Sequence, residues 1–474
     1  MGEDLTLHEY QDKVVERMIY QHFLALFLDP GLGKTAISLW AFRELFRAVD
    51  VSRMLVVAPL RVCYSVWPRE IAKWNQFSSD FGVEILHGPN RTERALRSDA
   101  QVLVINPEGL PWLEEQKWHI PEMLVVDEST RFKRKSAQRS KRLAKMLPSF
   151  GRRYALTGTP APNGLLDLHG QLFLVDLGKS LGENIGDYKA DYFVPVPCGP
   201  TQHFKWQPRT GSKQKIYDRI APWVVRLDAR DYLELPEKIL TEIPVSLPPR
   251  AKERYEALRR DMVLRLEEGD VVAMNAGSVT GKCRQIANGS VYLNDLGEIH
   301  YDRGKGYGHT KRRSAVIHTA KAEALAGLVE ELSGQPLLIG FEFRHERDVI
   351  RKALKPIVGS VPSLDGESSG REGALLERQW NAGELPVLMA HPQTAAHGLN
   401  LQDGGNHLCW YSIPWDLELH DQMVGRVWRQ GQEKRTFVYY LVAEDTIDLT
   451  VTRTLKRKAR DQDDLLNALR EDMR

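Results

Sequence analysis

Residues 23–35 read FLALFLDPGLGKT, a run of six apolar residues that leads into a glycine-rich turn and then into Lys34 and Thr35. The stretch that follows, AISLWAFRELF, has the apolar periodicity of a helix. A buried strand, a glycine loop and a helix that begins with Lys-Thr form a cradle for phosphate, because backbone N–H groups converge there and the helix N-terminus favours an anion. The stretch therefore predicts the start of an α/β domain with a nucleotide phosphate site.

Each residue of this cradle has an expected role. Gly31 and Gly33 let the backbone approach the phosphates, Lys34 reaches the β- and γ-phosphates, and Thr35 binds magnesium. Leu28 stands where the pattern G-x-x-x-x-G-K-[ST] has its first glycine. A glycine-rich turn before a helix, without any ligand, is the alternative at this point.

An acidic pair follows another apolar run, in MLVVDEST at residues 123–130. Asp127 is expected to hold magnesium, directly or through water, and Glu128 to orient or deprotonate the attacking water. An Asp-Glu pair after a strand is by itself usually a solvated loop. Together with the Lys34 loop in the same α/β domain, it favours hydrolysis of a phosphoanhydride.

Short apolar runs separated by helical stretches recur along the chain, and this alternation is typical of parallel sheets built from βαβ units. The expected strands lie at residues 23–28, 53–58, 101–106, 122–126, 152–156, 336–341, 386–390, 406–411 and 436–442. The sequence therefore predicts two α/β domains, at residues 1–170 and 316–474. Residues 171–315 contain Pro and Gly clusters and are expected to form helical insertions and loops between the two domains, without a third sheet, and the last segment to form a C-terminal helix.

Composition sets outer limits on the function. The chain has 474 residues, with 65 Lys and Arg against 63 Asp and Glu, a net charge of +2 that does not by itself indicate a polyanionic partner. The four cysteines lie far apart without a Cys-x-x-Cys pattern, so neither a zinc site nor a disulfide framework is indicated. The first apolar run has six residues, far below the roughly 20 that a membrane helix needs, and a soluble protein is expected.

Positive charge is concentrated directly after the acidic pair. Residues 131–145, RFKRKSAQRSKRLAK, carry eight Lys or Arg and no acid, which suits sequence-independent contact with a nucleic-acid backbone. A solvated basic helix is the alternative. A second cluster, YDRGKGYGHTKRR at residues 301–313, combines tyrosines with basic residues and fits either a nucleic-acid loop or a disordered one. The candidate nucleic-acid contacts of the first run are Arg131, Lys133, Arg134, Lys135 and Arg139.

A pair of arginines near the C-terminus could complete the hydrolytic site. Residues 421–432 read DQMVGRVWRQGQ, and Arg426 and Arg429 would share one face if this stretch were helical. By themselves they would be ordinary surface arginines. Hydrolysis of a phosphoanhydride is, however, often completed by an arginine from another domain.

The order of these motifs resembles the Swi/Snf family of superfamily-two helicase-like ATPases, which are DNA translocases with two RecA-like lobes. The match runs nearly end to end, and the last motif is highly specific to the family. LHEYQ (7–11) resembles the Q motif, DPGLGKT motif I, VVAPLRV (56–62) and VINPEGL (104–110) motifs Ia and Ib, VVDEST motif II and ALTGTPAPNG (155–164) motif III. LLIGFEFRHE (337–346), HGLNLQDGGN (397–406) and DQMVGRVWRQGQ resemble motifs IV, V and VI.

The resemblance implies two RecA-like lobes of the P-loop class that hydrolyse ATP with magnesium and bind DNA. It also implies roles for further residues. Gln11 would read the adenine, Gln422 would face the attacking water, and Arg426 and Arg429 would act as arginine fingers. The remaining assignments are Gly398 and Asn400 as sensors of nucleotide or strand, Thr157 and Thr159 as couplers of ATP state to strand contact, and Arg61 and Thr394 as strand contacts.

The implied function is ATP-dependent translocation on double-stranded DNA, stimulated by DNA. The alternatives are a strand-separating, annealing or branch-migrating helicase on forked DNA or RNA, and a non-hydrolysing, ATP-gated DNA-binding module. Two motifs depart from the family: motif II reads Asp-Glu-Ser-Thr where many relatives have Asp-Glu-Ala-His, and motif V opens with HPQTAAHG. The absence of chromatin-reading, zinc and nuclease modules suggests a minimal core of the phage or bacterial type. The expected location is the cytoplasm of a bacterial or phage-infected cell, or the nucleus if the protein is eukaryotic.

Overall fold

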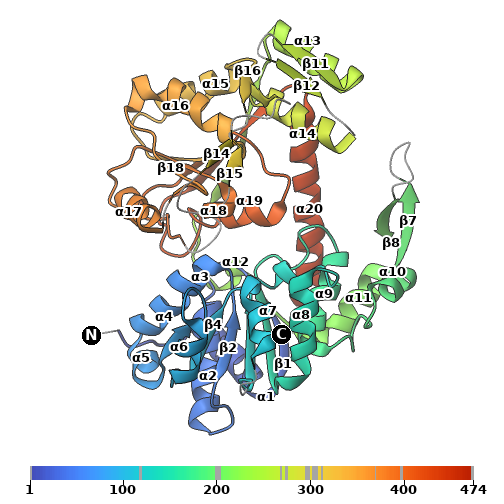
Figure 1. Ribbon diagram of the computed structural model, residues 1–474, viewed down its shortest axis with the longest axis vertical. Coiled ribbons are helices and arrows are strands. Elements are labelled where there is room, and N and C mark those ends of the chain that lie inside the picture. The colour runs from blue at the N-terminus through green and yellow to red at the C-terminus, as the bar shows by residue number, and fades with distance from the viewer. Residues whose placement is uncertain are drawn as a thin grey trace. The chain divides into compact units, whose positions relative to one another are not determined.

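Two units, each built on a parallel sheet flanked by helices, make up the chain (Figure 1). The computed structural model describes residues 3–116, 120–197, 204–266, 269–272, 276–293, 299–301, 308–310, 313–368, 370–395 and 399–470. Unit 1 comprises Met1–Glu234 and Lys458–Arg474, and unit 2 comprises Leu235–Arg457. These bounds follow packing, whereas the domain limits expected at residues 170 and 315 follow the motifs and stay a prediction.

Unit 1 contains a seven-stranded sheet with the order β3-β4-β2-β5-β6-β1-β9. All of its pairings are parallel, and its central strands are buried on both faces, which explains why they read as continuous apolar runs. The strands are β1 (Phe23–Leu28), β2 (Met54–Val57), β3 (Val83–Ile85), β4 (Val102–Ile105), β5 (Met123–Asp127), β6 (Arg152–Thr157) and β9 (Val224–Leu227).

Helices cover this sheet and bury its apolar side chains in one core, to which Leu465, Leu466 and Leu469 of the C-terminal helix α20 (Ile447–Arg470) contribute. The other helices are α1 (Glu9–Tyr20), α2 (Lys34–Arg47), α3 (Leu60–Ser65), α4 (Trp67–Lys73), α5 (Asn75–Asp80), α6 (Arg91–Arg97), α7 (Leu110–Glu115), α8 (Gln138–Met146), α9 (Leu166–Asp176), α10 (Ile185–Tyr192), α11 (Ser212–Ile220) and α12 (Ala229–Tyr232). An antiparallel ribbon of β7 (Phe193–Pro197) and β8 (Phe204–Pro208) extends beyond α10 (Figure 1).

Unit 2 contains a six-stranded parallel sheet with the order β10-β21-β20-β17-β19-β18. Its strands are β10 (Lys238–Val245), β17 (Leu337–Gly340), β18 (Ser363–Leu364), β19 (Val387–Ala390), β20 (His407–Trp410) and β21 (Thr436–Ala443). Its helices besides α20 are α13 (Pro249–Asp261), α14 (Ala276–Ala287), α15 (Ala320–Glu331), α16 (Arg344–Val358), α17 (Gly370–Asn381), α18 (Pro392–Ala395) and α19 (Leu417–Val424). Short antiparallel ribbons pair β11 (Val263–Leu266) with β12 (Gly269–Val272), β13 (Ser290–Tyr292) with β16 (Ser314–Val316), and β14 (Ile299–Tyr301) with β15 (Gly308–Thr310).

The predicted fold class is confirmed, because two parallel sheets with flanking helices are present and every apolar run expected as a strand forms one. The region at 171–315 differs from the expectation of helices and loops alone. It supplies β9 to the first sheet and β10 to the second, together with short ribbons. β9 has four residues, and β10 is an edge strand whose side chains are largely exposed, so neither stands out as an apolar run.

Within the described part of the chain, no helix has both the length and the apolar character needed to span a bilayer.

A buried ion pair fixes the start of α20 in unit 2. The ammonium of Lys321 on α15 lies 2.6 Å from Asp448 Oδ2 and donates hydrogen bonds to Asn288 Oδ1 at 2.7 Å and to the Tyr411 carbonyl at 3.2 Å. The Asp448 carboxylate also accepts a hydrogen bond from the Ala443 amide at 3.0 Å. Burial of both charges is tolerated because each is paired and hydrogen-bonded.

Lys321→Met should lower the free energy of unfolding by about 3–5 kcal/mol, because the buried Asp448 carboxylate loses its cation. Lys252→Ala is the matched control, since Lys252 pairs with Asp445 at 2.8 Å on the exposed surface of the same unit, where ion pairs contribute little. Urea unfolding followed by circular dichroism measures both changes. Equal losses for the two variants would contradict the role given to the buried pair.

Candidate active site

The phosphate loop, residues 29–33, joins the carboxyl end of β1 to the first turn of α2. Gly31 and Gly33 have φ angles of 93° and 78°, a left-handed region that glycine adopts without strain. Gly33 precedes Lys34 and Thr35, which open the helix. The loop therefore has the local geometry that the sequence predicts for a phosphate cradle.

The Lys34 ammonium lies inside this loop. Its Nζ donates hydrogen bonds to the carbonyl oxygens of Leu28 at 2.7 Å and Asp29 at 3.3 Å. Burial lowers the pKa of Lys34, and the neighbouring carboxylates of Glu128 and Asp127 act in the opposite direction. The Lys34 ammonium therefore lies where it can bind phosphate oxygens, and it interacts electrostatically with Asp127 and Glu128.

Asp127 ends β5 and is held by two donors. The Trp67 indole Nε1 donates to Asp127 Oδ2 at 3.1 Å, and the Glu128 amide donates to Oδ1 at 3.1 Å. Burial raises the pKa of Asp127, while the Trp67 hydrogen bond and the charge of Lys34 lower it. The carboxylate is thus oriented toward the phosphate loop by its neighbours.

Glu128 has a φ of 53°, a left-handed conformation that costs a non-glycine residue roughly 1–3 kcal/mol. Such backbone outliers cluster at functional sites, where the surrounding structure holds them. The turn at Glu128 ends the strand abruptly after Asp127, and a short 3-10 helix, Ser129–Phe132, begins immediately after it. The two carboxylates therefore leave the strand in different directions.

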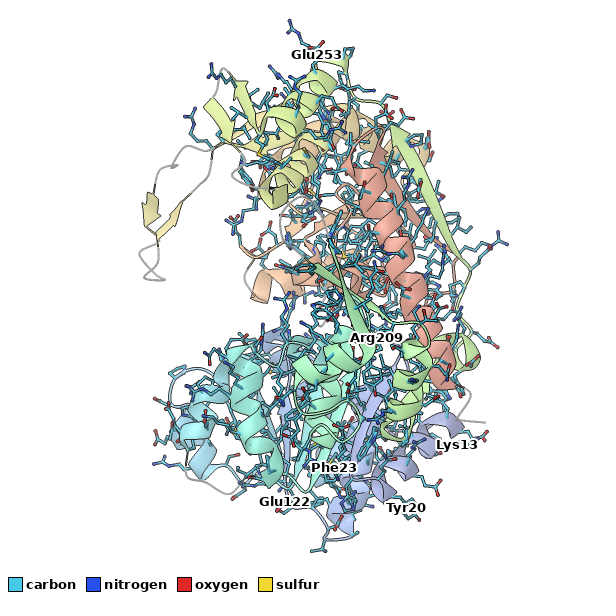
Figure 2. The ribbon with its side chains drawn as sticks, turned by 90° about the vertical axis from the view of Figure 1, so that its right-hand side faces the viewer. Lys13, Tyr20, Phe23, Glu122, Arg209 and Glu253 are labelled. Carbon is cyan, nitrogen blue, oxygen red and sulfur yellow. The ribbon has the colours of Figure 1, made fainter. Side chains whose placement is uncertain are left out.

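Strand β6 lies between β5 and β1, and it brings Thr157 and Thr159 to the same edge of the sheet. Thr157 pairs in register with Phe27 of β1, and its Oγ1 accepts a hydrogen bond from the Thr159 amide at 3.0 Å. A Cβ at Gly158 would lie 3.1 Å from Pro30 Cδ, so the motif III turn packs closely against the phosphate loop. Figure 2 labels Phe23 and Glu122, which mark the opposite, amino edge of this sheet.

Motifs II and III are also joined through one buried glutamine. The Ser129 hydroxyl donates to Gln171 Oε1 at 2.9 Å, and Gln171 Nε2 donates to the Pro160 carbonyl. Ser129 and Gln171 are fully buried. Ser129 belongs to the Asp-Glu-Ser-Thr variant of motif II, so this chain connects the two motifs without the histidine that many relatives carry.

Gln11 on α1 contacts the phosphate loop itself. Its Nε2 donates to the Leu32 carbonyl at 3.3 Å, and its Oε1 accepts a hydrogen bond from the His8 amide at 3.0 Å. A Cβ at Gly33 would lie 2.5 Å from Gln11 Nε2, so a larger residue at this position would displace the Gln11 amide. The role of Gln11 in reading adenine stays a prediction.

The donor set at this edge fits a nucleoside triphosphate with magnesium. The Thr35 hydroxyl and the Asp127 carboxylate are hard oxygen ligands of the kind that magnesium prefers, and Lys34 supplies the cation for phosphate oxygens. Among the described residues no cluster of three or more His, Cys, Asp or Glu suits a different, all-protein metal site. The magnesium assignment remains a proposal.

Unit 2 carries the predicted arginines, but they do not share a helical face. Helix α19 ends at Val424, and the chain then forms turns, with the Arg426 amide bonded to Met423 O and the Val427 amide to Val424 O in the i to i+3 pattern. Arg426 Nη1 donates to the Leu399 carbonyl at 2.8 Å, and Arg429 Nη1 donates to Asn400 Oδ1. Both guanidinium groups therefore reach one short loop despite lying outside the helix.

The other predicted residues of unit 2 are placed as follows. Gln422 lies on α19, donates to Glu418 Oε1 at 3.4 Å, and has a buried Oε1 that accepts no hydrogen bond within the described part of the chain. The backbone amide of Asn400 donates a hydrogen bond to Glu377 Oε1 at 3.0 Å. Thr394 lies in α18, and Gly398 lies outside the described residues.

Part of the basic run at residues 131–145 is neutralised within unit 1, because at least four of its eight cations lie within 4 Å of acidic side chains. Arg142 and Lys145 both pair with Glu114, at 2.6 and 2.8 Å. The other two pairs join Arg139 to Glu108 and Lys133 to Asp167, each at 3.9 Å.

Lys135 in the same run lies 3.4 Å from the centre of the Phe173 ring, and burial lowers its pKa. Arg131 has a partner within the chain. Arg134 and Lys141 are exposed, and among the described residues neither side chain forms an ion pair. Arg61, on α3, also has a partner within the chain. The nucleic-acid contacts stay predictions, and the 301–313 cluster lies mostly outside the described residues.

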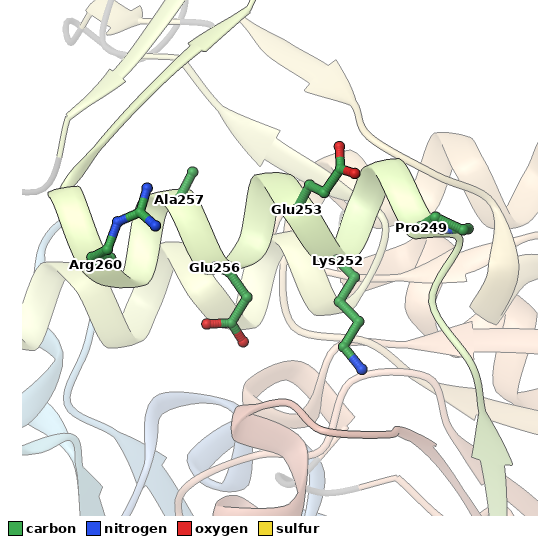
Figure 3. Close-up of a pocket in the computed structure, with 6 residues that line it drawn as sticks. All are labelled: Pro249, Lys252, Glu253, Glu256, Ala257 and Arg260. Carbon is green, nitrogen blue, oxygen red and sulfur yellow. The ribbon is translucent and has the colours of Figure 1, made fainter.

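Trp67 is a site residue that the sequence analysis missed. It lies 60 positions before Asp127, and no local pattern connects the two. The available signal was topological: Trp67 follows β2, which pairs with β5 in parallel, so the segments after both strands share one edge. An open surface pocket with a volume of 490 Å³ is lined by Pro249, Lys252, Glu253, Glu256, Ala257 and Arg260 of α13 (Figure 3). It contains no motif residue and lacks the converging polar groups of a ligand site.

Trp67→Phe should raise the magnesium concentration needed for half-maximal nucleotide hydrolysis by about 10-fold, because residues that orient a metal ligand contribute 10- to 100-fold in metal affinity or activity. Trp74→Phe is the matched control, since Trp74 Nε1 donates to Glu70 Oε1 at 2.8 Å in the same α4 region without contacting Asp127. Steady-state hydrolysis across a magnesium titration measures the effect. If both variants reach half-maximal hydrolysis at the same magnesium concentration, Trp67 has no role in orienting Asp127.

Comparison with known proteins identifies the family. Residues 10–294 match the SNF2-related domain, and residues 320–431 match the helicase conserved C-terminal domain. Protein p41 of Acyrthosiphon pisum secondary endosymbiont phage 1 is 32% identical over 98% of this chain and 99% of its own length. The DNA repair and recombination protein RAD54-like of Gallus gallus is 23% identical over 89% of this chain, which spans 61% of that longer protein.

Among solved structures, the SWI2/SNF2 ATPase core of Sulfolobus solfataricus in complex with dsDNA aligns over 98% of this chain and 94% of its own, with 21% identity and a TM-score of 0.44. The SNF2-related domain alone covers more than half of the 474 residues, and it contains the phosphate loop, the acidic pair and the motif III turn. The helicase C-terminal domain contains Asn400, Arg426 and Arg429. The chain belongs to the SNF2 family of helicase-like ATPases and is an ATP hydrolase.

Proposed function

We propose that this ATPase is a motor that moves along double-stranded DNA, with DNA stimulating its turnover and magnesium accompanying ATP. The observation that carries the proposal is the meeting of four residues predicted for hydrolysis at the carboxyl edge of the first sheet. Lys34, Thr35, Asp127 and Glu128 come from adjoining segments of that edge, and Thr157 of motif III lies beside them. The name of the RAD54-like relative, a DNA repair and recombination protein, supports DNA as the partner.

In the proposed mechanism, the phosphate loop and the N-terminus of α2 bind the phosphates, and Lys34 turns from its carbonyl partners to the β- and γ-oxygens. Glu128 accepts the proton of the attacking water. Thr35 and Asp127 would hold magnesium, which would supply positive charge against the phosphate oxygens. These residues lie on fixed strand and helix ends, so the site is pre-organised for charge stabilisation.

Unit 2 would supply the remaining groups. We propose that Arg426 and Arg429 stabilise the negative charge that develops on the transferred phosphoryl group. An arginine in this role strongly raises the rate of hydrolysis in related nucleotide hydrolases. The unsatisfied, buried Oε1 of Gln422 supports an additional donor, such as the attacking water, in the active state. Thr157, Thr159, Asn400 and Thr394 are proposed to transmit the nucleotide state to the strand.

DNA contact is proposed to depend on backbone charge and to have little sequence preference. Within the basic run, Arg134 and Lys141 are the cations left exposed without an ion pair among the described residues, so they are the first candidates for phosphate contacts. The similarity to a phage protein supports a bacterial cytoplasm, including that of an infected cell, as the setting.

ATP turnover of the purified chain should be faster with duplex DNA than without it, and the protein should displace a third strand from a triplex in an ATP-dependent manner. Lys34→Ala should abolish turnover. Glu128→Gln should lower kcat by about 10²- to 10⁴-fold, the usual contribution of a general base, while ATP binding persists.

Two outcomes would redirect this proposal. Unwinding of forked duplexes or RNA, with no triplex displacement, would indicate a strand-separating or branch-migrating helicase. Normal DNA affinity with ATP binding but no turnover in the wild type would indicate an ATP-gated binding module.

The double variant Arg134→Ala with Lys141→Ala should weaken duplex binding and reduce the slope of log affinity against log salt concentration by about 2, since each lost phosphate contact removes about 1. Arg142→Ala with Lys145→Ala removes the same formal charge from the same run, but both cations are paired with Glu114. Fluorescence anisotropy across a salt series distinguishes the two variants. Equal slopes in both would show that the run acts only through its total charge.

A further inference from the structure

Asp29, the first residue of the phosphate loop, binds the segment through which the chain leaves unit 1. Its Oδ1 accepts a hydrogen bond from Arg226 Nη1 at 2.8 Å, and its Oδ2 accepts one from the Ala229 amide at 3.0 Å. Its own amide donates to the Leu227 carbonyl at 3.3 Å. The side chain and the amide of Asp29 are therefore both committed to residues 226–229, which form the end of β9 and the start of α12.

Arg226 is the buried counterpart of this contact, with 4% of its surface exposed. It also donates to the carbonyls of Phe27, at 3.1 Å, and Leu227. A buried guanidinium is costly unless its donors and its charge are both satisfied. Asp29 is the closest carboxylate, with Asp228 at 3.9 Å as the next. Movement of Asp29 would therefore disturb Arg226 and the backbone around it.

The same residue is connected to the cation of the ATP site. The Asp29 carbonyl accepts a hydrogen bond from Lys34 Nζ at 3.3 Å, next to the Leu28 carbonyl at 2.7 Å. When Lys34 binds phosphate oxygens, both carbonyls lose the ammonium as a donor, and the Asp29 carbonyl keeps only the Leu32 amide at 3.4 Å. The Asp29 side chain is placed to convey that change to Arg226 and Ala229.

The far end of this chain segment is attached to the arginine-bearing turn of unit 2. The Trp428 indole Nε1 donates to the Pro236 carbonyl at 2.8 Å, and the Lys238 ammonium lies 4.2 Å from the centre of the Trp428 ring. Trp428 stands between Arg426 and Arg429 in sequence. Residues 226–238, the exit segment, thus begin at the phosphate loop in unit 1 and end at the arginine turn in unit 2.

We propose that Asp29 and Arg226 are positioning residues that couple nucleotide binding at Lys34 to the exit segment. The coupling deepens the proposed function and rests on its ATP-binding step, but it requires no DNA. Its direct reporter is the Ala229 amide, because that N–H is bonded to the side chain of Asp29 and to no other described group.

A matched pair elsewhere in unit 1 controls for a purely structural role. Arg152 is buried, donates to the carbonyls of Met18 and Ile19 at 3.2 and 2.9 Å, and pairs with Asp50 at 2.6 Å. Its chemistry is that of the Arg226 and Asp29 pair, but it lies at the start of β6, at the opposite edge of the sheet from the phosphate loop. Asp29→Asn and Asp50→Asn therefore each remove the carboxylate charge from a buried arginine, and Asp50 is the more exposed of the two carboxylates.

Hydrogen exchange of the full chain, measured by mass spectrometry with and without AMP-PNP and magnesium and without DNA, tests the coupling. In the wild type and in Asp50→Asn, the nucleotide should change exchange in peptides covering residues 227–238. Asp29→Asn should lose that change and lower kcat by about 10-fold, since small misplacements in an active site have effects of this size or larger. Arg226→Lys, which keeps the charge but not the planar fork, should show an intermediate response.

The outcomes separate this inference from the motor proposal. A wild type that binds AMP-PNP without any change in the exit segment, or an Asp29→Asn variant that responds as the wild type does, would overturn the coupling. Loss of the response in Asp50→Asn as well would assign both pairs to stability alone. Absence of DNA stimulation, by contrast, would contradict the motor and leave the coupling intact.

Discussion

The parallel pairing of β6 between β5 and β1 is the constraint on which the rest of the active site depends. Because all three strands run in one direction, the phosphate loop, the acidic pair and the motif III turn leave the sheet at one edge. Each segment then turns in its own way, with glycines at 31 and 33 and a left-handed residue at Glu128. The strands are buried on both faces, so the position of this edge is fixed by the core of unit 1.

Three polar groups of the site in unit 1 have hydrogen-bond partners within the chain. Lys34 is bonded to backbone carbonyls, Asp127 to the Trp67 indole, and Gln11 to the phosphate loop. Buried polar groups require such partners, since an unpaired one costs about 1–3 kcal/mol. On this account, ATP binding exchanges the partners of Lys34, and the nucleotide can affect the rest of the chain through the Leu28 and Asp29 carbonyls that lose the ammonium as a donor.

Much of this arrangement was predictable from the sequence, because the buried parallel strands are continuous apolar runs and their carboxyl ends carry the motif residues. The contacts that hold the motif residues were not. Trp67 and Asp127 meet only because β2 and β5 are neighbours, and β9 is too short and too late in the chain to be assigned to the first sheet. Arg426 and Arg429 would share a face only if their segment were helical, and helix α19 ends before them. The charges at 131–145 looked free because their acidic partners, Glu108, Glu114 and Asp167, are distant in sequence.

The central claim is that ATP hydrolysis at this edge drives movement along duplex DNA. ATP turnover measured at saturating concentrations of linear duplexes of increasing length, and on a covalently closed circle, tests it most directly. A motor that moves and dissociates at ends should hydrolyse ATP faster as the duplex lengthens, with the highest rate on the circle. A rate independent of length and topology would show that DNA only activates the ATPase, and would contradict translocation.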